Sequence, residues 1–193
     1  MKIRRISFFI ILSLTLTIAS AQQGRSAIDL AGRWAFAIDG SDVGVTGEWY
    51  AKDLPETISL PGSMAQNGKG YDVTVDTKWT GGIVDKTWYT DQKYEKYRRP
   101  GNVKVPFWLN PVKVYVGAAW YQKYVDVPRG WEGKHVELFL ERCHWETRLW
   151  VDNQEIGTNA SLSTPHVYDL SRVLTTADIG FRCVLTTESR RSM

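Results

Sequence analysis

The chain has 193 residues, a formal charge of +3 at pH 7, nine tryptophans, nine tyrosines and two cysteines. Three positive charges, Lys2, Arg4 and Arg5, lie within the first 21 residues, which contain no acidic residue, so the remainder of the chain is formally neutral. A neutral chain lacks the basic surface that dominates affinity for a phosphate backbone. We therefore expect no nucleic acid among its partners.

The first 21 residues have the pattern of a secretory signal peptide. A basic start precedes an unbroken apolar run from Ile6 to about Ile18, and Ala19-Ser20-Ala21 supplies the small residues of a cleavage site. The alternative is an N-terminal membrane anchor, but a span needs roughly 20 apolar residues and this run is shorter. We predict cleavage near Ala21, export to the periplasm or the extracellular space, and no membrane attachment of the mature chain.

Residues 22–29 form a polar leader, and alternating apolar and polar residues then indicate strands. The first, within residues 30–40, places Trp34, Phe36 and Ile38 on one face, and further short strands are expected at 57–60, 112–116, 120–127, 135–141, 147–151, 155–157 and 166–170. Turn residues separate them at regular spacing, which is typical of an all-β sandwich or barrel. The stretch 119–170 consists of such strands joined by short turns, and it organises the domain.

Residues 64–111 interrupt this pattern with a long irregular excursion. Glycines alternate there with aromatic residues, and basic residues cluster between positions 93 and 99. A long connection in a compact domain is usually functional or disordered, and the aromatic content argues against disorder. We interpret this segment as a long loop insertion with room for one hairpin.

Several ordered motifs resemble the N-terminal sugar-binding domain of glycoside hydrolase family 2. They are L-x-G-x-W-x-F at 30–36, LPGSM at 60–64, W-Y-x-K-x-V-x-V-P at 120–128, W-x-G-K-x-V-x-L at 131–138, LWVDNQEIG at 149–157 and PHVYDLS at 165–171. Their order and spacing match across residues 30–174. The ERCHWET and SLSTPHVYDL segments look most similar to β-galactosidase-like members among secreted bacterial enzymes.

This resemblance implies a jelly-roll β-sandwich of the galactose-binding-domain-like type. In the family, an immunoglobulin-like domain and a (β/α)₈ barrel follow this domain, and the barrel carries a pair of catalytic glutamates that act on a β-linked glycoside. Such a pair lies roughly 5 Å apart in retaining enzymes. Residues 1–193 supply neither the barrel nor the pair, so we expect no catalytic residue in this chain, which is inactive alone.

The tail, residues 175–193, departs from the family pattern. The family ends the domain with a strand of the form G-x-H-x-L-x-I-R-V-D-N-R, and this chain instead has TTADIGFRCVLTTESRRSM. With chosen codons, residues 176–193 read two bases out of frame give GRHRFPLRVDNRIKEIN, which contains the expected G-x-H and R-V-D-N-R. We interpret the tail as the product of a frameshift that leaves a sheet edge exposed; the alternative is a divergent end.

Candidate carbohydrate-binding residues lie in the excursion. Trp79 and Trp88 offer large faces for stacking on sugar rings, and Asp76 and Asp85 are placed to reach a neighbouring active site. The alternative for the tryptophans is to cover the edge of the sandwich. Three other tryptophans, Trp34, Trp120 and Trp150, are expected in the core.

The corner motif HWET is interpreted as a contact with the following domains, through Trp145 and Glu146. Glu141 and Glu146 flank this corner and are expected in hydrogen bonds or salt bridges rather than in catalysis. The three histidines lack metal-ligand spacing, and we expect neither metal nor cofactor. Cys143 is expected as a free thiol.

Two functions remain open from the sequence. The first is an accessory domain of an exported family 2 β-glycosidase, truncated and inactive by itself. The second is a free-standing carbohydrate-binding module, which would end in a completed last strand and bind a sugar alone.

Overall fold

The computed structural model describes residues 25–79, 83–105, 110–174 and the backbone of 180–188. Strands dominate, and the helices are short 3₁₀ turns. The strands are β1 (Gly32–Asp39), β2 (Glu56–Leu60), β3 (Tyr71–Asp72), β4 (Lys113–Val114), β5 (Ala118–Asp126), β6 (Glu137–Leu140), β7 (Glu146–Val151), β8 (Gln154–Ala160), β9 (His166–Asp169) and β10 (Gly180–Glu188). The 3₁₀ turns are η1 (Trp49–Ala51), η2 (Lys86–Tyr89), η3 (Gln92–Tyr97) and η4 (Arg129–Trp131). No helix in the described ranges has the length and apolarity needed to cross a membrane.

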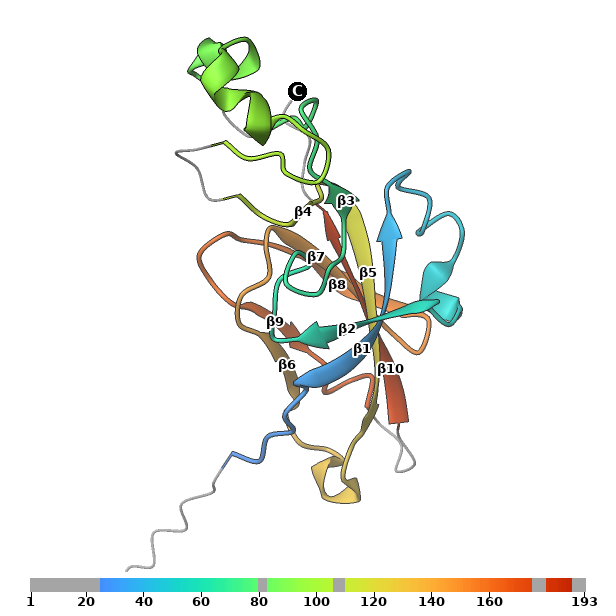
Figure 1. Cartoon of the computed structure of the whole chain (residues 1–193). Helices are drawn as coiled ribbons and strands as arrows, with labels where there is room; N and C mark the ends of the chain where they lie inside the picture. Colours follow the sequence, from blue (N-terminus) through green and yellow to red (C-terminus); the bar gives the residue numbers. More distant parts are fainter. Residues whose placement is uncertain (1–24, 80–82, 106–109, 175–179, 189–193) are drawn as a thin grey trace, which may run out of the picture.

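Two antiparallel layers form a β-sandwich. A six-stranded sheet has the order β2-β1-β5-β10-β7-β8, and β6 pairs with β9 in a second, smaller sheet (Figure 1). The main core fills the space between them, with residues from both layers among its members. The structure thus confirms the predicted all-β sandwich.

Alternation along β1 and β5 explains how these strands divide their side chains between two cores. Trp34 and Phe36 on β1 and Val125 on β5 are buried in the main core. Trp120, also on β5, is buried on the opposite face of the large sheet. Successive side chains of a strand point to opposite faces, so one strand can serve both cores.

The outer face of the large sheet is covered by the segment between β1 and β2. Its cluster contains Trp120 and Trp150, whose rings stack with centroids 5.2 Å apart, and Tyr50 stacks on Trp150 at 5.5 Å with the ring planes 8° apart. Trp34, Trp120 and Trp150 are 3%, 0% and 2% exposed, which confirms their predicted place in the core.

The tail contributes β10 to the centre of the large sheet. Its backbone pairs antiparallel with β5 on one side, from Gly180 to Thr187, and with β7 on the other, from Cys183 to Glu188. The expectation of an exposed sheet edge is therefore wrong. Residues 181–187, FRCVLTT, lack the family motif. They are nevertheless rich in aromatic and β-branched residues, which favour strands. The frameshift itself remains a prediction about the gene.

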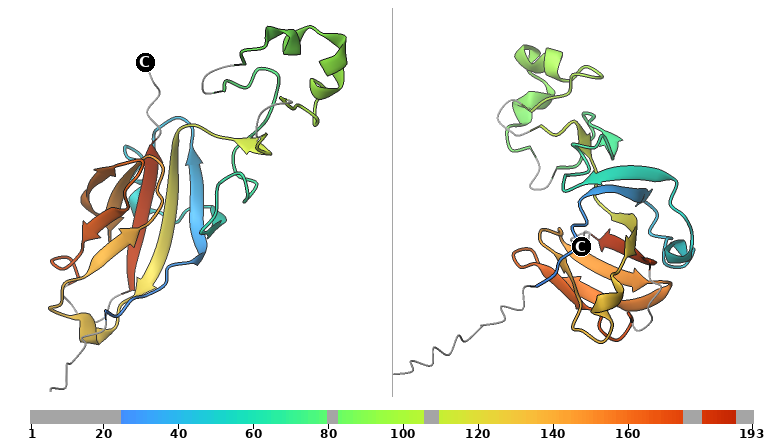
Figure 2. Two further views of the ribbon diagram at one scale, coloured as in Figure 1. Left: turned by 90° about the vertical axis from the view of Figure 1, so that its left-hand side faces the viewer. Right: turned by 90° about the horizontal axis from the view of Figure 1, so that it is seen from below.

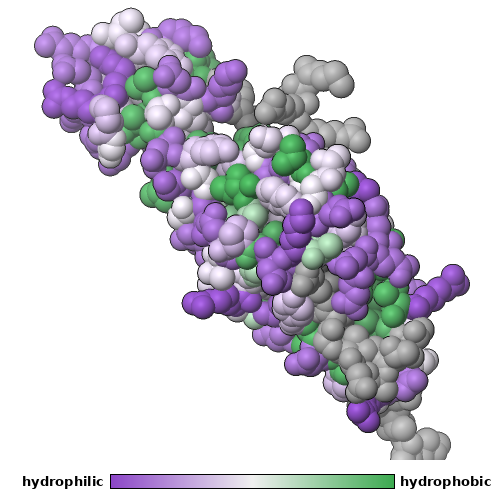
Figure 3. Space-filling view, turned by 90° about the vertical axis from the view of Figure 1, so that its right-hand side faces the viewer, coloured by the Kyte–Doolittle hydropathy of each residue, from purple (hydrophilic) through white to green (hydrophobic). Residues whose placement is uncertain are grey.

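The excursion forms an arm, which we define as residues 71–116. The pairing of β3 with β4 makes its stalk, and η2 and η3 lie near its tip, away from the sandwich (Figures 1 and 2). Within its described residues the arm has a small core of its own, built on Ile83, Trp88 and Val105. In the space-filling view polar residues predominate on the arm, and apolar residues show in small separate patches (Figure 3).

Candidate functional site

Trp88 lies at the centre of the arm core. Its side chain is 1% exposed, and the indole Nε1 donates a hydrogen bond to the carbonyl of Lys104 over 2.8 Å. Arg98 donates in turn to the carbonyl of Trp88 over 2.6 Å. A covered ring offers no face to a sugar, so the predicted stacking role of Trp88 is wrong. Trp88 instead holds the arm together.

The other three predicted residues of the arm differ in their surroundings. Trp79 is half-buried against the arm core, and Asp76 is exposed. Asp85 caps η2 by accepting from the backbone and the hydroxyl of Thr87 over 2.9 and 2.7 Å. These hydrogen bonds hold the pKa of Asp85 below its ordinary value, and the bond from the Thr87 hydroxyl contributes most. Asp85 therefore has a structural role at η2.

The HWET corner precedes β7. Trp145 is half-buried, and its carbonyl accepts from the backbone of Ser161 over 3.3 Å. Glu146 begins β7, where it pairs with Ala160 of β8. Cys143 is a free thiol, as expected, and its burial raises its pKa to about 11. A thiol held protonated is a poor nucleophile at neutral pH.

Behind this corner lies a buried polar network between β7 and β9. The hydroxyl of Thr147 is 2.7 Å from His166 Nδ1 and 2.6 Å from the Tyr168 hydroxyl, which also donates to the carbonyl of Thr147 over 2.8 Å. His166 Nε2 is 3.2 Å from the backbone nitrogen of Ser161. The network joins the HWET and PHVYDLS motifs, which the sequence analysis noted separately.

An exposed cluster surrounds His135, two residues before β6 begins at Glu137. Its Nε2 is 2.9 Å from Glu137, and its Nδ1 is 3.1 Å from the hydroxyl of Ser171. The hydrogen bond with Glu137 raises the pKa of His135 above its ordinary value. The Ser171 hydroxyl already donates to Asp169 over 2.5 Å. Among the described residues no group of three His, Cys, Asp or Glu side chains is placed to hold a metal ion.

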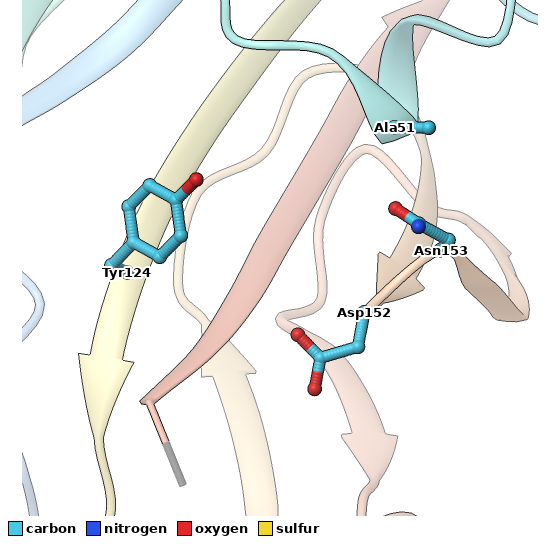
Figure 4. A pocket seen from close by; sticks show the side chains of 4 residues that line it. All are labelled: Ala51, Tyr124, Asp152 and Asn153. Carbon is cyan, nitrogen blue, oxygen red and sulfur yellow. The ribbon is translucent and has the colours of Figure 1, made fainter.

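A pocket of about 240 Å³ opens on the outer side of the large sheet. Ala51 lines it from η1, Tyr124 from β5, and Asp152 and Asn153 from the turn between β7 and β8 (Figure 4). The Tyr124 side chain is 60% exposed, and its hydroxyl donates to Asp53 over 3.2 Å. At this pocket the structure brings an accessible aromatic ring and polar side chains together.

No sequence motif indicated this pocket. The predicted strands at 120–127, which contains Tyr124, and at 147–151 and 155–157, on either side of Asp152-Asn153, are present in the structure. The sequence did not reveal that β10 pairs between β5 and β7. This pairing sets the distance between Tyr124 on β5 and the turn that follows β7. Because the tail was interpreted as aberrant, no sequence signal connected them.

Comparisons with known proteins agree with this fold. No protein-family model matches the chain. It is 23% identical over 150 residues to a β-glucuronidase from Paenibacillus borealis, a match that covers 77% of this chain and 19% of that protein. The β-glucuronidase structures from Lactobacillus rhamnosus and Ruminococcus gnavus superpose with TM-scores of 0.57 and 0.53, both at 18% identity. The matches cover 84% and 83% of this chain and 21% and 20% of theirs.

One further Ruminococcus gnavus structure, at TM-score 0.53 and 18% identity, holds that β-glucuronidase in complex with D-glucuronic acid. The ERCHWET and SLSTPHVYDL segments look most similar to β-galactosidase-like members, whereas these relatives are all β-glucuronidases. The chain spans about a fifth of the length of the relatives that it matches. The homologues found are therefore β-glucuronidases, which belong to glycoside hydrolase family 2, and the similarity covers most of this chain and about a fifth of theirs.

Proposed function

We propose that this chain is the N-terminal accessory domain of an exported family 2 β-glycosidase. One observation carries the proposal: the relatives match over 77–84% of this chain, while the match occupies only 19–21% of their own length. Most of each relative therefore lies outside the shared domain. In the intact enzyme the substrate is a β-linked glycoside, and the catalytic work belongs to the domains that follow.

The two glutamates that flank the HWET corner support a role without chemistry. Glu141 is exposed beside Arg142, and Glu146 lies in the pairing of β7 with β8. Neither lines the pocket on the outer side of the sheet. A retaining glycosidase needs two facing carboxyl groups at a bound sugar. The domain would therefore support and position the catalytic part.

A hydrolysis assay tests whether the chain is inactive alone. The purified mature chain is incubated with 4-nitrophenyl β-D-glucuronide and 4-nitrophenyl β-D-galactoside, and release of nitrophenol is followed. We expect no release above the rate in buffer. Turnover that co-purifies with the chain and persists after removal of contaminating enzymes would contradict an accessory role.

Export is the second part of the proposal, and it concerns residues outside the described ranges. The signal-peptide pattern of residues 1–21 supports it. Intact-mass measurement of the protein from the periplasm or the medium should give a chain that begins at Gln22. A full-length chain retained in the membrane fraction would show that the segment is an anchor instead.

We propose that the corner at Trp145 and Glu146 contacts the following domains. Trp145 is half-buried, and the network behind it fixes the start of β7. An aromatic side chain held at a rigid corner is a suitable anchor for a packed interface.

The alternative function is a free-standing carbohydrate-binding module. The central position of β10 favours it, because the large sheet has its strands joined without a gap between β5 and β7. The DNA downstream of the gene distinguishes the two functions, since only the accessory domain requires a catalytic domain encoded there.

A further inference from the structure

We propose that the side chain of Asn67 closes the outer edge of β2 and thereby prevents this strand from pairing with β2 of a second copy of the chain. Strand β2 ends the order β2-β1-β5-β10-β7-β8, so one of its two edges faces away from the sheet (Figure 1). The backbone N–H and C=O groups at such an edge can pair with a strand of another chain. Protection of this edge is useful to a domain of an enzyme and to a free module alike, so it does not depend on the accessory role.

The Asn67 side chain pairs with the outer edge of β2 as one residue of a neighbouring strand would. Its Oδ1 accepts from the backbone nitrogen of Ser59 over 2.9 Å, and its Nδ2 donates to the carbonyl of Ser59 over 3.1 Å. In an antiparallel sheet, two opposed residues of a hydrogen-bonded pair exchange the same two bonds. Asn67 therefore occupies the position that a strand from outside would need.

Thr57 is the next residue of β2 whose backbone faces outwards. It lies two residues before Ser59 in the register of β2 with β1. Because hydrogen-bonded and non-hydrogen-bonded pairs alternate along an antiparallel ladder, its backbone points to the same side as that of Ser59. Two β2 strands related by a two-fold axis at Ile58 would pair Ser59 of one copy with Thr57 of the other. Asn67 blocks one half of each of these pairs.

The turn that carries Asn67, residues 61–70, is fixed against the sandwich. The backbone nitrogen of Ser63 donates to Gln66 Oε1 over 3.0 Å, and the backbone nitrogen of Gln66 donates to the Ser63 hydroxyl over 3.1 Å. Met64 packs against the main core. The Nδ2 of Asn67 also donates to the carbonyl of Ser63 over 3.0 Å. These contacts hold the Asn67 side chain at the strand edge before any second chain approaches.

The two ends of β2 are protected in other ways. Pro55 directly precedes the strand and Pro61 directly follows it, and proline has no backbone N–H to donate to a neighbouring strand. Lys69, near the end of the same turn, forms an ion pair with Glu56 over 2.6 Å. Prolines and charges discourage pairing at edge strands. Asn67 adds protection within the strand, which these residues at its ends do not cover.

Sedimentation equilibrium of the mature chain and its variants tests this role. Asn67→Ala should form a dimer that the unchanged chain does not form, with a Kd of about 100 µM. Adding Thr57→Pro to Asn67→Ala should restore the monomer, because proline removes the N–H that the second copy would use. Asn110→Ala is the matched control and should not dimerise. The Asn110 amide makes the same pair of hydrogen bonds, over 2.7 and 3.0 Å, but to the backbone of Val105 in the arm.

Amide hydrogen exchange followed by NMR gives a second readout, which is already informative without a variant. In the unchanged chain the Ser59 amide should exchange slowly, because it donates to Asn67, whereas the Thr57 amide at the same edge should exchange quickly. In the Asn67→Ala dimer the Thr57 amide should become protected. The proposal is overturned if both amides exchange quickly in the unchanged chain. It is equally overturned if Asn67→Ala stays monomeric at about 1 mM, or if Asn110→Ala dimerises as strongly.

Discussion

Thr147 connects two strands through a buried side chain. It lies on β7 and is fully buried, and its hydroxyl contacts two residues of β9, His166 and Tyr168. A buried polar group that loses its hydrogen-bond partner still carries its full desolvation penalty, and no hydrogen bond offsets that penalty. The network therefore makes the pairing of these motifs specific, since another packing would leave several polar atoms unsatisfied.

Thr147→Val should lower the free energy of unfolding by about 1–3 kcal/mol, because His166 Nδ1 and the Tyr168 hydroxyl each lose a partner. Urea denaturation followed by tryptophan fluorescence measures the change. Thr158→Val is the control, since Thr158 is an exposed threonine of β8. Equal stability of the two variants would show that the network contributes nothing.

The His135 cluster gives a pH dependence of known sign. Its folded-state pKa is raised above 6.5, first by the hydrogen bond with Glu137. A raised pKa means that the imidazolium stabilises the folded chain below pH 6.5, and that this contribution disappears as the pH rises through the folded-state pKa. The effect on stability is small because the side chain is exposed.

Glu137→Gln should return the pKa of His135 towards 6.5, because the neutral amide no longer favours the charged imidazole. Titration of the imidazole C–H signals by NMR measures this directly. In the control Glu141→Gln, an exposed carboxylate beside Arg142 is removed and the pKa of His135 should stay raised. An unchanged pKa in Glu137→Gln would assign the shift to another group.

At the scale of elements, the arm packs around its own core. Trp88 is buried among arm residues, while the main core draws its members from the sandwich. Two clusters without shared residues can lose structure separately. The arm should therefore unfold locally before the sandwich does.

Trp88→Ala should open the arm and leave the sandwich folded. We expect cleavage by a low concentration of trypsin within residues 83–105, which hold several lysines and arginines, while the unfolding midpoint of the sandwich changes little. Val84→Ala, at a side chain that is 86% exposed, is the control and should remain uncleaved. Global loss of structure in Trp88→Ala would mean that arm and sandwich form one cooperative unit.

Unlike the arm, strand β10 is integral to the sandwich. It lies between β5 and β7, so its removal separates the large sheet into two parts. A chain that ends at Leu174 should fail to give a cooperative unfolding transition and should associate through the newly exposed strand edges. Cooperative unfolding of this shortened chain, measured by circular dichroism, would show that the tail is dispensable.

Most strands were predictable from the sequence because their residues alternate. The pattern around Trp34 and Phe36 gave β1, and the alternation over residues 135–141 gave β6. The tail was not recognised as a strand because it was compared with a family motif that it lacks. A strand forms only where a neighbouring strand offers an unpaired edge, in addition to having residues with β propensity. No local sequence pattern shows where such an edge lies.

For the whole molecule, the ordered motifs were sufficient to indicate the family, and the relatives agree. The candidate sites were less predictable. Trp88, which was predicted to stack on sugar rings, is 1% exposed, whereas Tyr124, which no motif singled out, is 60% exposed. Exposure depends on tertiary packing, so a count of aromatic residues in a loop could not identify the accessible ring.

The central claim is that this chain is one domain of a longer family 2 glycosidase. Sequencing the gene together with the DNA that follows it tests this claim most directly. We predict that an immunoglobulin-like domain and a (β/α)₈ barrel with two catalytic glutamates are encoded downstream, in the same or a shifted frame. If no frame downstream encodes such a barrel, the claim is contradicted.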